Sequence, residues 1–416
     1  MKLQALLIGA TLSVVAAGTA AGDENTGASP GQGPLAGTGG NTAAPVTKKL
    51  NSKRDDWTSD HYRKAKPKPF PAVDQTLTQT MLDESTDNPQ PQDSTQDQPG
   101  VSTPGHPPLL EKPALERLEK RLYVPDESRS DAAEPDANTA ETGSPAQQAA
   151  RNAAVPLDVG FRRAYFSSQA LAPLEADREY PYSTTGRLFF RIPNEGLFAC
   201  SGSVISLRLI LTAGHCVHSG SGNENGWFTD FEFVPAYRDG VAPFSTWKGS
   251  AAFVTAPWYV GNGTVPNVAD YALIEVEDQT VDGVPRKIGE IVGYLGFQTN
   301  RLLPNHAHLL GYPAAFDDGE RMHQVTAQSF RKYDNNTALY GADMTEGSSG
   351  GPWIMNFGPA ASGQTGNAEP TRNLVIGATS YGFASPPLSI LGSSTLDGNF
   401  TSMLSAACSS RPGNCP

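Results

Sequence analysis

Two adjacent serines lie in a glycine-rich stretch, TEGSSGGPWI at residues 345–354, and either could supply a nucleophilic hydroxyl. A serine hydroxyl is a poor nucleophile until a base takes its proton, and the base needs an acid to hold its tautomer. The chain offers His215 in LTAGHCVHSG at residues 211–220 and Asp270 in NVADYALIEV at residues 267–276. Singly, each is a common turn or surface residue. Together, at strand ends and turns, they predict hydrolysis through an activated serine.

The glycine cluster also fits a second hydrolase pattern. Gly347 and Ser349 match G-x-S-x-G, the nucleophile elbow of α/β-hydrolases, which would favour an esterase. That fold places its catalytic histidine after the serine, and all seven histidines here precede Ser349. No motif supports a catalytic aspartate upstream of His215 either, so the order that remains is His, Asp, Ser.

The elements that must position these residues are short strands. From about residue 156, apolar runs alternate with turns rich in Gly, Asn, Asp and Pro, and no long amphipathic helical pattern intervenes. This pattern of short apolar runs and turns predicts an all-β sandwich or barrel over residues 156–416. The strand-like runs are 187–192, 203–213, 271–276 and 374–383.

The start of the chain is typical of a secretory signal. In residues 1–21, Lys2 supplies the charge, Leu3–Ala17 the apolar run, and Ala20 or Ala21 the small residue at a cleavage site. This run is too short for a membrane anchor and no later stretch is long enough, so we expect secretion to the extracellular space without stable membrane insertion. The formal net charge of −12 argues against nucleic-acid binding.

Residues 22–155 differ in composition from the rest of the chain. They are dominated by Gly, Pro, Ser, Thr, Asn, Gln and Asp, and such a segment buries too little apolar surface to offset its ordering entropy. We therefore predict a largely disordered pro-segment or linker. Leu115, Leu118 and Leu122 recur at helical spacing, which predicts a short helix near residues 113–123. That helix either docks on the following domain or frays in a disordered tail.

Three blocks carry a family resemblance. TAGHC at residues 212–216, DYALI at 270–274 and GSSGGP at 347–352 resemble the signature blocks of chymotrypsin-like, trypsin-fold serine peptidases. Within that family the chain is most similar to the secreted glutamyl-endopeptidase branch, over roughly residues 178–405. The further shared pieces are YPY at 180–182, GYP at 311–313 and YGADM at 340–344.

The resemblance implies two six-stranded antiparallel β-barrels with the active site in the cleft between them. It implies that Ser349 is the nucleophile, that His215 is the general base and later the acid, and that Asp270 orients His215. The backbone N–H groups of Gly347 and Ser349 would form the oxyanion hole, where developing negative charge is stabilised. Neither a metal nor another cofactor is expected.

Four cysteines in a secreted chain suggest disulfides, and four cysteines allow three pairings. The resemblance implies that Cys200 pairs with Cys216, sixteen residues apart, to brace the histidine loop. Cys408 and Cys415 would then close a small C-terminal loop.

The resemblance leaves the side-chain preference open. The stretch Ser380 to Gly382 resembles the strand that pairs with the substrate backbone. Asp343 lies six residues before the nucleophile, where a trypsin carries the acid that selects Lys or Arg. Members of the glutamyl branch can carry an Asp there too, and they recognise the substrate carboxylate with a His where this chain has Thr379. Acidic and basic preferences therefore both stay open.

The sequence thus predicts a secreted serine endopeptidase that cleaves protein or peptide substrates through an acyl-enzyme, as a monomer. Ser348 stands where trypsins carry an Asp that pairs with a newly cut N-terminus. A neutral hydroxyl cannot make that ion pair, so we expect a pro-enzyme that is activated in another way. The alternative is a non-catalytic binding protein with the peptidase fold; such relatives usually lack a triad residue, and none is lacking here.

Overall fold

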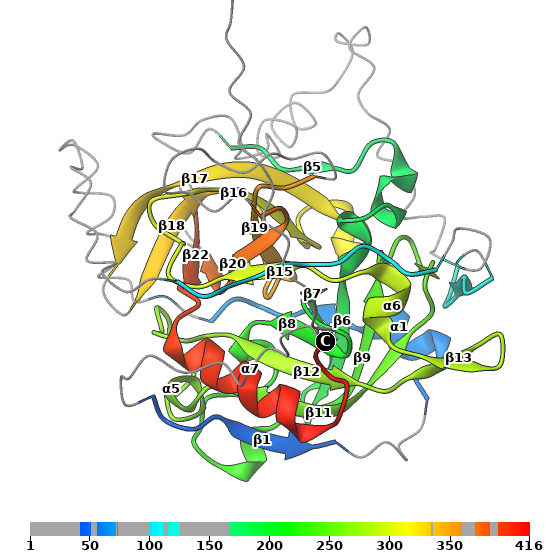
Figure 1. The fold of residues 1–416 in the computed structure, drawn as a ribbon, viewed down its shortest axis with the longest axis horizontal. Coiled ribbons are helices and arrows are strands. Elements are labelled where there is room, and N and C mark those ends of the chain that lie inside the picture. Colours follow the sequence, from blue (N-terminus) through cyan, green and yellow to red (C-terminus); the bar gives the residue numbers. More distant parts are fainter. Residues whose placement is uncertain are drawn as a thin grey trace, which may run out of the picture. The chain divides into compact units, whose positions relative to one another are not determined.

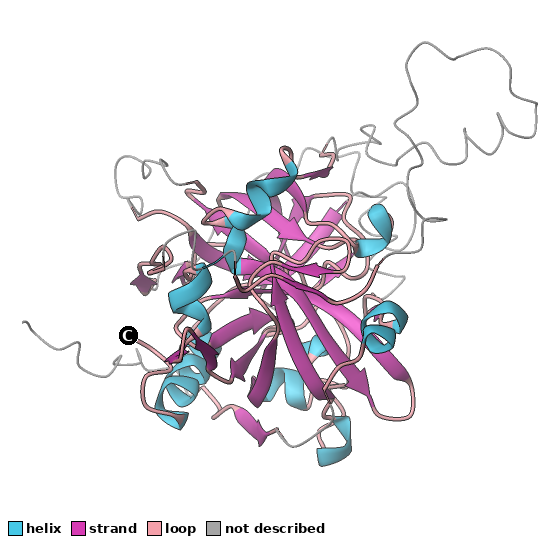
Figure 2. Ribbon diagram, turned by 90° about the vertical axis from the view of Figure 1, so that its right-hand side faces the viewer, coloured by secondary structure: helices cyan, strands magenta, loops and turns pink. Residues whose placement is uncertain are grey.

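The computed structural model is built mainly of strands, as Figure 2 shows. The predicted all-β class is therefore confirmed. The expected signal at residues 1–21 lies outside the described residues. The described residues are 42–50, 56–71, 73, 100–110, 115, 117–124, 166–333, 336–358, 371–382 and 390–416.

Six antiparallel strands form a closed barrel in the first half of the domain. The barrel closes because β9 pairs with both β6 and β11. Side chains alternate between two cores as the pleat requires: Leu188 and Phe190 lie in one apolar cluster, and Phe189 between them lies in another. In order around the barrel, the strands are β6 (Thr185–Ile192), β7 (Gly196–Val204), β8 (Leu209–Thr212), β12 (Ala272–Val276), β11 (Trp247–Val254) and β9 (Thr229–Pro235).

The second half forms another curled sheet of mainly antiparallel strands. The N–H of Ser380, just past β20, donates to the carbonyl of Gly392 in β22 at 2.9 Å, which brings the sixth strand of this run back to the first. Its six central strands are β22 (Ile390–Ser394), β18 (Thr337–Gly341), β17 (His323–Tyr333), β16 (His306–Gly311), β19 (Pro352–Met355) and β20 (Leu374–Ala378). Short strands at its edges are β21 (Tyr381–Gly382), β15 (Gly296–Gln298) and β5 (Gln169–Ala170).

Helix α7 (Gly398–Ser410) lies along β11 and β12 (Figure 1). It begins where the Asp397 carboxylate accepts a hydrogen bond from the N–H of Asn399. Its buried side chains recur at helical spacing and contact the barrel; they are Phe400, Met403, Leu404 and Ala407. Among the described residues, no helix is long and apolar enough to cross a membrane.

Short elements complete the domain. Two α-helices, α5 (Ala256–Tyr259) and α6 (Ile288–Val292), and the strands β10 (Val241–Ala242), β13 (Gln279–Val281) and β14 (Val284–Arg286) lie in its connections. Single turns of 3₁₀ helix lie at Leu174–Arg178, Tyr182–Thr184, Gly214–Cys216, Glu224–Gly226 and Asp317–Gly319.

Parts of residues 22–155, a segment predicted to be largely disordered, form short elements against this domain, and the rest of the segment lies outside the described residues. Each short strand adds to an available edge: β1 to β11, β2 to β7, β3 to β15 and β4 to β10. Buried Tyr62 and Tyr123 anchor the segment, and backbone pairing needs no apolar periodicity. The elements are β1 (Val46–Lys49), α1 (Ser59–Lys64), β2 (Lys66–Pro67), β3 (Ser102–Thr103) and β4 (Lys120–Arg121).

The helix expected near residues 113–123 does not extend to its predicted end. The N–H of Leu118 donates to the carbonyl of Leu115 at 3.0 Å, which makes a turn. The chain then enters strand β4, and Leu122 donates to the carbonyl of Gly240 at 2.7 Å. The residues after Leu118 pair with β10 in place of continuing the helix. Residues 113, 114 and 116 lie outside the described part of the chain.

Candidate active site

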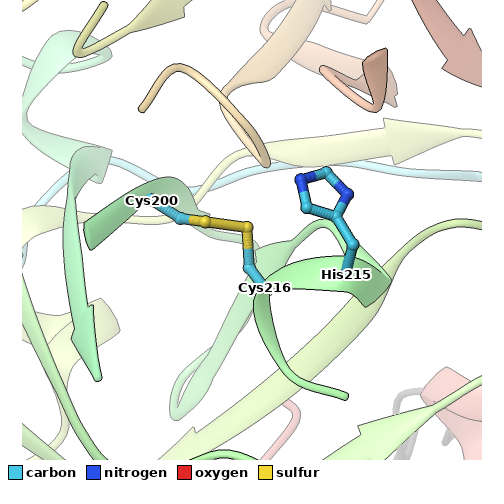
Figure 3. A group of neighbouring side chains, drawn as sticks. All are labelled: Cys200, His215 and Cys216. Atoms are coloured by element: carbon cyan, nitrogen blue, oxygen red, sulfur yellow. A yellow bond between two sulfur atoms is a disulfide. The ribbon is translucent and has the colours of Figure 1, made fainter. Parts of the chain in front are cut away.

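His215 lies just past the end of β8, in the 3₁₀ turn Gly214–Cys216. Cys216 forms a disulfide with Cys200 of β7, which fixes this turn to the barrel beside the imidazole (Figure 3). The ligand atoms of these two cysteines and His215 lie within 4.8 Å of one another, the one such group among the described residues. A metal would need thiolates, and the two sulfurs are bonded to each other, so the group is a structural brace.

His215 connects an acid on one side to a hydroxyl on the other. Its Nδ1 lies 2.8 Å from Oδ2 of Asp270, and its backbone N–H donates to Oδ1 of the same carboxylate at 2.8 Å. Its Nε2 lies 2.8 Å from Oγ of Ser349. An Nδ1–H donated to the carboxylate leaves Nε2 free to accept the serine proton. The structure thus brings the three predicted catalytic residues into one hydrogen-bonded path.

The Asp270 carboxylate is fully buried, and donors around it compensate for its desolvation. Besides the two bonds from His215, the hydroxyl of Ser380 donates to Oδ2 at 2.6 Å. The backbone N–H of Asp270 in turn donates to Oγ of Ser394 at 3.0 Å. The sequence suggested a substrate-binding role for Ser380, and its hydroxyl is bonded to Asp270. No local motif could have indicated either serine as a partner of Asp270.

The turn that carries Ser349 depends on glycines at two positions. Gly347 and Gly350 have φ of +86° and +80°, in the left-handed region that favours glycine. A Cβ at Gly350 would also lie 2.1 Å from Oγ1 of Thr212. Ser201 of β7 holds the turn from the other barrel, because its N–H donates to the Ser349 carbonyl at 2.8 Å and its hydroxyl to the Gly347 carbonyl at 2.9 Å.

The two adjacent serines have different partners. The hydroxyl of Ser348 donates to the carbonyl of Thr345 at 2.6 Å, and the residue is fully buried. The hydroxyl of Ser349 faces the imidazole instead. Only Ser349 therefore has a base within reach of its proton.

A family model described as Trypsin matches residues 178–386, about half of the chain. The chain belongs to the trypsin family. The fold and the resemblance inferred from the three sequence blocks are both confirmed.

Curated relatives of this trypsin-family chain come from bacilli. It is 28% identical over 137 residues to a protein named Glutamyl endopeptidase from Bacillus licheniformis, covering 32% of this chain and 37% of that one. It is 26% identical over 127 residues to one named Extracellular metalloprotease from Bacillus subtilis, covering 30% and 36%. The chain thus spans little more than a third of the length of these relatives.

Among solved structures, it is similar to the protease Anisep from Arthrobacter nicotinovorans, with 27% identity and a TM-score of 0.46 over 58% of this chain and all of that one. It is also similar to a Glu endopeptidase in complex with MPD, with 20% identity and a TM-score of 0.44 over 58% and 96%.

Two of the remaining predicted substrate-binding residues have partners within this trypsin-family chain. Oδ1 of Asp343, the position that carries the selective acid in trypsins, accepts the N–H of Ser168 at 2.8 Å. The buried hydroxyl of Thr379 accepts the indole N–H of Trp353 at 2.9 Å, so it is directed into the core. Both disulfides implied by the resemblance are present, with Cys408 bonded to Cys415 just past α7.

Proposed function

We propose that the chain is a secreted serine endopeptidase, made as a pro-enzyme, with Ser349 as nucleophile, His215 as base and Asp270 as the orienting acid. The observation that carries the proposal is the continuous path from carboxylate to imidazole to hydroxyl, with each step at 2.8 Å. Membership of the trypsin family supports it independently.

The first half of the reaction follows from this geometry. As Oγ of Ser349 bonds to the substrate carbonyl carbon, its proton passes to Nε2 of His215, and the Asp270 carboxylate stabilises the imidazolium. The imidazolium then gives that proton to the leaving amine as the C–N bond breaks. In the second half, Nε2 of His215 takes a proton from water, and the water oxygen bonds to the acyl carbon. The imidazolium then returns the proton to Oγ of Ser349 as the ester bond breaks, which releases the product acid and leaves Ser349 free.

The oxyanion of each tetrahedral intermediate needs donors that are already in position. We assign the N–H groups of Gly347 and Ser349 to this role. The φ of +86° at Gly347 supports the assignment, since it puts the peptide in a conformation that other residues rarely adopt. Losing such a donor lowers kcat by a factor of about 10²–10³.

Replacing each of the two serines tests the nucleophile. Ser349→Ala should abolish peptide hydrolysis and labelling by a fluorophosphonate probe. Ser348→Ala is the matched control, because it removes a neighbouring hydroxyl that donates to the Thr345 carbonyl and not to His215, and it should keep both activities. Activity that survives Ser349→Ala would refute the proposal, and so would a folded chain that never reacts even after its N-terminal segment has been cleaved off.

The name of one relative suggests metal-dependent proteolysis, and a chelator separates the two chemistries. Our proposal expects peptide hydrolysis to persist in EDTA and to stop with a fluorophosphonate. The opposite pattern would favour a metalloprotease.

Secretion is supported by residues 1–21, by the two disulfides and by the name of one relative, which describes that protein as extracellular. A pro-enzyme is supported by the N-terminal segment that packs against the domain. Cleavage-site profiling on a peptide library tests the side-chain preference. Enrichment of Glu would match the name of the other relative, while enrichment of Lys or Arg would give Asp343 the trypsin role.

A further inference from the structure

The proline-alternating stretch KPKPFP, residues 66–71, runs beside the candidate active site. Its strand β2 pairs in parallel with Phe198 and Ala199 of β7, immediately before the disulfide cysteine Cys200. The N–H of Lys68 then donates to the Ala199 carbonyl at 2.8 Å. The stretch is therefore held by the backbone of the first barrel, in the manner of an added strand.

The next group along this stretch meets the proposed oxyanion hole. The carbonyl of Lys68 accepts the N–H of Gly347 at 3.3 Å. The preceding ring is also close, since a Cβ at Gly347 would lie 3.1 Å from Cβ of Pro67. With the Lys68 carbonyl bound to the N–H of Gly347, a substrate carbonyl cannot use that donor of the proposed oxyanion hole.

Phe70 continues the contact onto the second sheet. Its ring packs so closely on Gly382 that a Cβ there would lie 2.8 Å from Cε2 of the ring. Gly382 belongs to the strand expected to bind substrate backbone, and Phe70 joins the apolar cluster of the second sheet. With this stretch in place, Ser349 is fully buried and His215 is 3% exposed.

The charge of the Lys68 side chain is influenced by the same region. The pKa of its ammonium is lowered, because the effect of burial exceeds the opposing effect of the negative charges of Glu195 and Asp270. The backbone contacts place Lys68 beside the proposed oxyanion hole, and the effect of Asp270 on its ammonium agrees with that placement.

We infer that Lys66–Phe70 is an internal ligand of the substrate site that keeps the uncut chain inactive. The inference rests on the proposed peptidase function. The prolines fix φ at alternate positions, so the stretch is extended before it binds and loses little entropy on binding. The peptide bond that follows the Lys68 carbonyl joins Lys68 to Pro69. The nitrogen of Pro69 bears a ring carbon in place of hydrogen. A bond to proline at that point protects the internal ligand from cleavage by the active site that it blocks.

Helix α1 fixes the register of this ligand. Its Tyr62 is 4% exposed and contacts the Phe189 ring edge-on at 5.1 Å between centroids. The indole N–H of Trp57 donates to the Asp230 carbonyl at 2.7 Å. A single residue, Ala65, separates α1 from β2, so these anchors determine where Lys68 lies.

The test compares full-length chains. The double variant Pro67→Gly, Phe70→Ala removes the two side chains that contact Gly347 and Gly382. The matched control is Val124→Ala, at a residue of the same N-terminal segment that is 62% exposed. Fluorophosphonate labelling reports access to Ser349. The double variant should label faster by about tenfold or more, since a site open for about 10% of the time or less reacts in proportion to its open fraction. The control should label at the wild-type rate.

A second measurement needs no activity. Because of the prolines, residues 66–71 carry exchangeable backbone amides only at Lys66, Lys68 and Phe70. In the full chain with Ser349→Ala, hydrogen exchange should be slow at Lys68, which donates to Ala199, and should become fast in the double variant. Fast exchange at Lys68 in the otherwise unchanged chain would overturn the inference, even if the double variant failed to fold.

The outcomes separate the two proposals. Equal and rapid labelling of the wild-type chain and the double variant, with none in Ser349→Ala, would refute the internal ligand and leave the serine nucleophile standing. No labelling of any folded chain, the double variant included, would refute the peptidase function and with it the inhibitory role. Faster labelling of the double variant together with slow exchange at Lys68 in the unchanged stretch would support both.

Discussion

The hydroxyl of Ser380 offers a sharp test of the site geometry, because it donates to Asp270 without being part of the path from acid to nucleophile. Ser380→Ala removes the 2.6 Å bond to Oδ2, in a position with no exposed surface for water to replace it. The carboxylate keeps its two bonds from His215. The variant should therefore fold and keep a weakened hydrogen-bonded path from Asp270 to Ser349.

The expected loss follows from the kind of bond removed. A hydrogen bond to a charged group contributes about 1.5–3 kcal/mol. If that energy stabilises the transition state through the orientation of His215, kcat/KM falls about 10- to 150-fold, because each 1.36 kcal/mol is a factor of ten. The loss should appear mainly in kcat, since the bond lies on the side of the imidazole away from Ser349.

The assay is peptide hydrolysis by chains with and without Ser380→Ala, both carrying Pro67→Gly and Phe70→Ala so that the site is open, with thermal unfolding measured in parallel. Ser393→Ala is a matched control: Ser393 is a buried serine of β22 whose hydroxyl accepts from Ala378 and donates to the Ser394 carbonyl. It should lose stability and keep kcat. An unchanged kcat in Ser380→Ala, or a loss as complete as in Ser349→Ala, would refute this account of Asp270.

Three further predictions concern specificity and stability. Asp343→Asn should leave the ratio of cleavage after Lys or Arg to cleavage after Glu unchanged, because an amide oxygen can still accept the Ser168 N–H; profiling that shifts this ratio would contradict it. Replacing Cys408 and Cys415 by Ser should lower the free energy of unfolding by about 2.5 kcal/mol, the closure entropy of so short a loop, and leave kcat/KM unchanged; a loss of activity would contradict it. Burial raises the pKa of Asp177 to about 6 from 3.8, so its folded state holds a proton that the unfolded chain releases. Its contribution to stability therefore falls by about 3 kcal/mol as pH rises from about 4 to about 6, then stays constant. In urea titrations, Asp177→Asn should gain stability relative to wild type over that range; an opposite or absent trend would refute it.

The candidate catalytic residues could be proposed from the sequence because each of them lies in its own local motif. His215 follows a strand beside a cysteine, Asp270 opens a buried strand, and Ser349 lies in a turn that needs glycine at positive φ. Such signals depend on a few neighbouring residues, so a single sequence displays them. Helix α7 also has local signals, Asp397 at its N-cap and apolar residues at helical spacing, although the strand-rich sequence around it led to no prediction of a helix there.

Contacts between distant segments could not be predicted in this way. Neither Ser380 nor Ser394 has a neighbour in sequence that indicates a bond to Asp270. Strands as short as Lys66–Pro67 show no periodicity, and pairing by backbone leaves no pattern in the side chains. The low apolar content of the N-terminal segment suggested disorder because the sequence does not reveal which sheet edges are available to it.

The N-terminal strands have a consequence for the lifetime of the enzyme. Val46 pairs with Val254, and Ser102 with Gln298, so one segment covers edges in both halves of the domain. If activation removes that segment, these edges lose backbone partners that were present while the chain folded. An active enzyme that later unfolds would have to refold without them. We therefore expect its persistence to be governed by how slowly it unfolds rather than by an equilibrium free energy, and its thermal inactivation to be irreversible and dependent on scan rate.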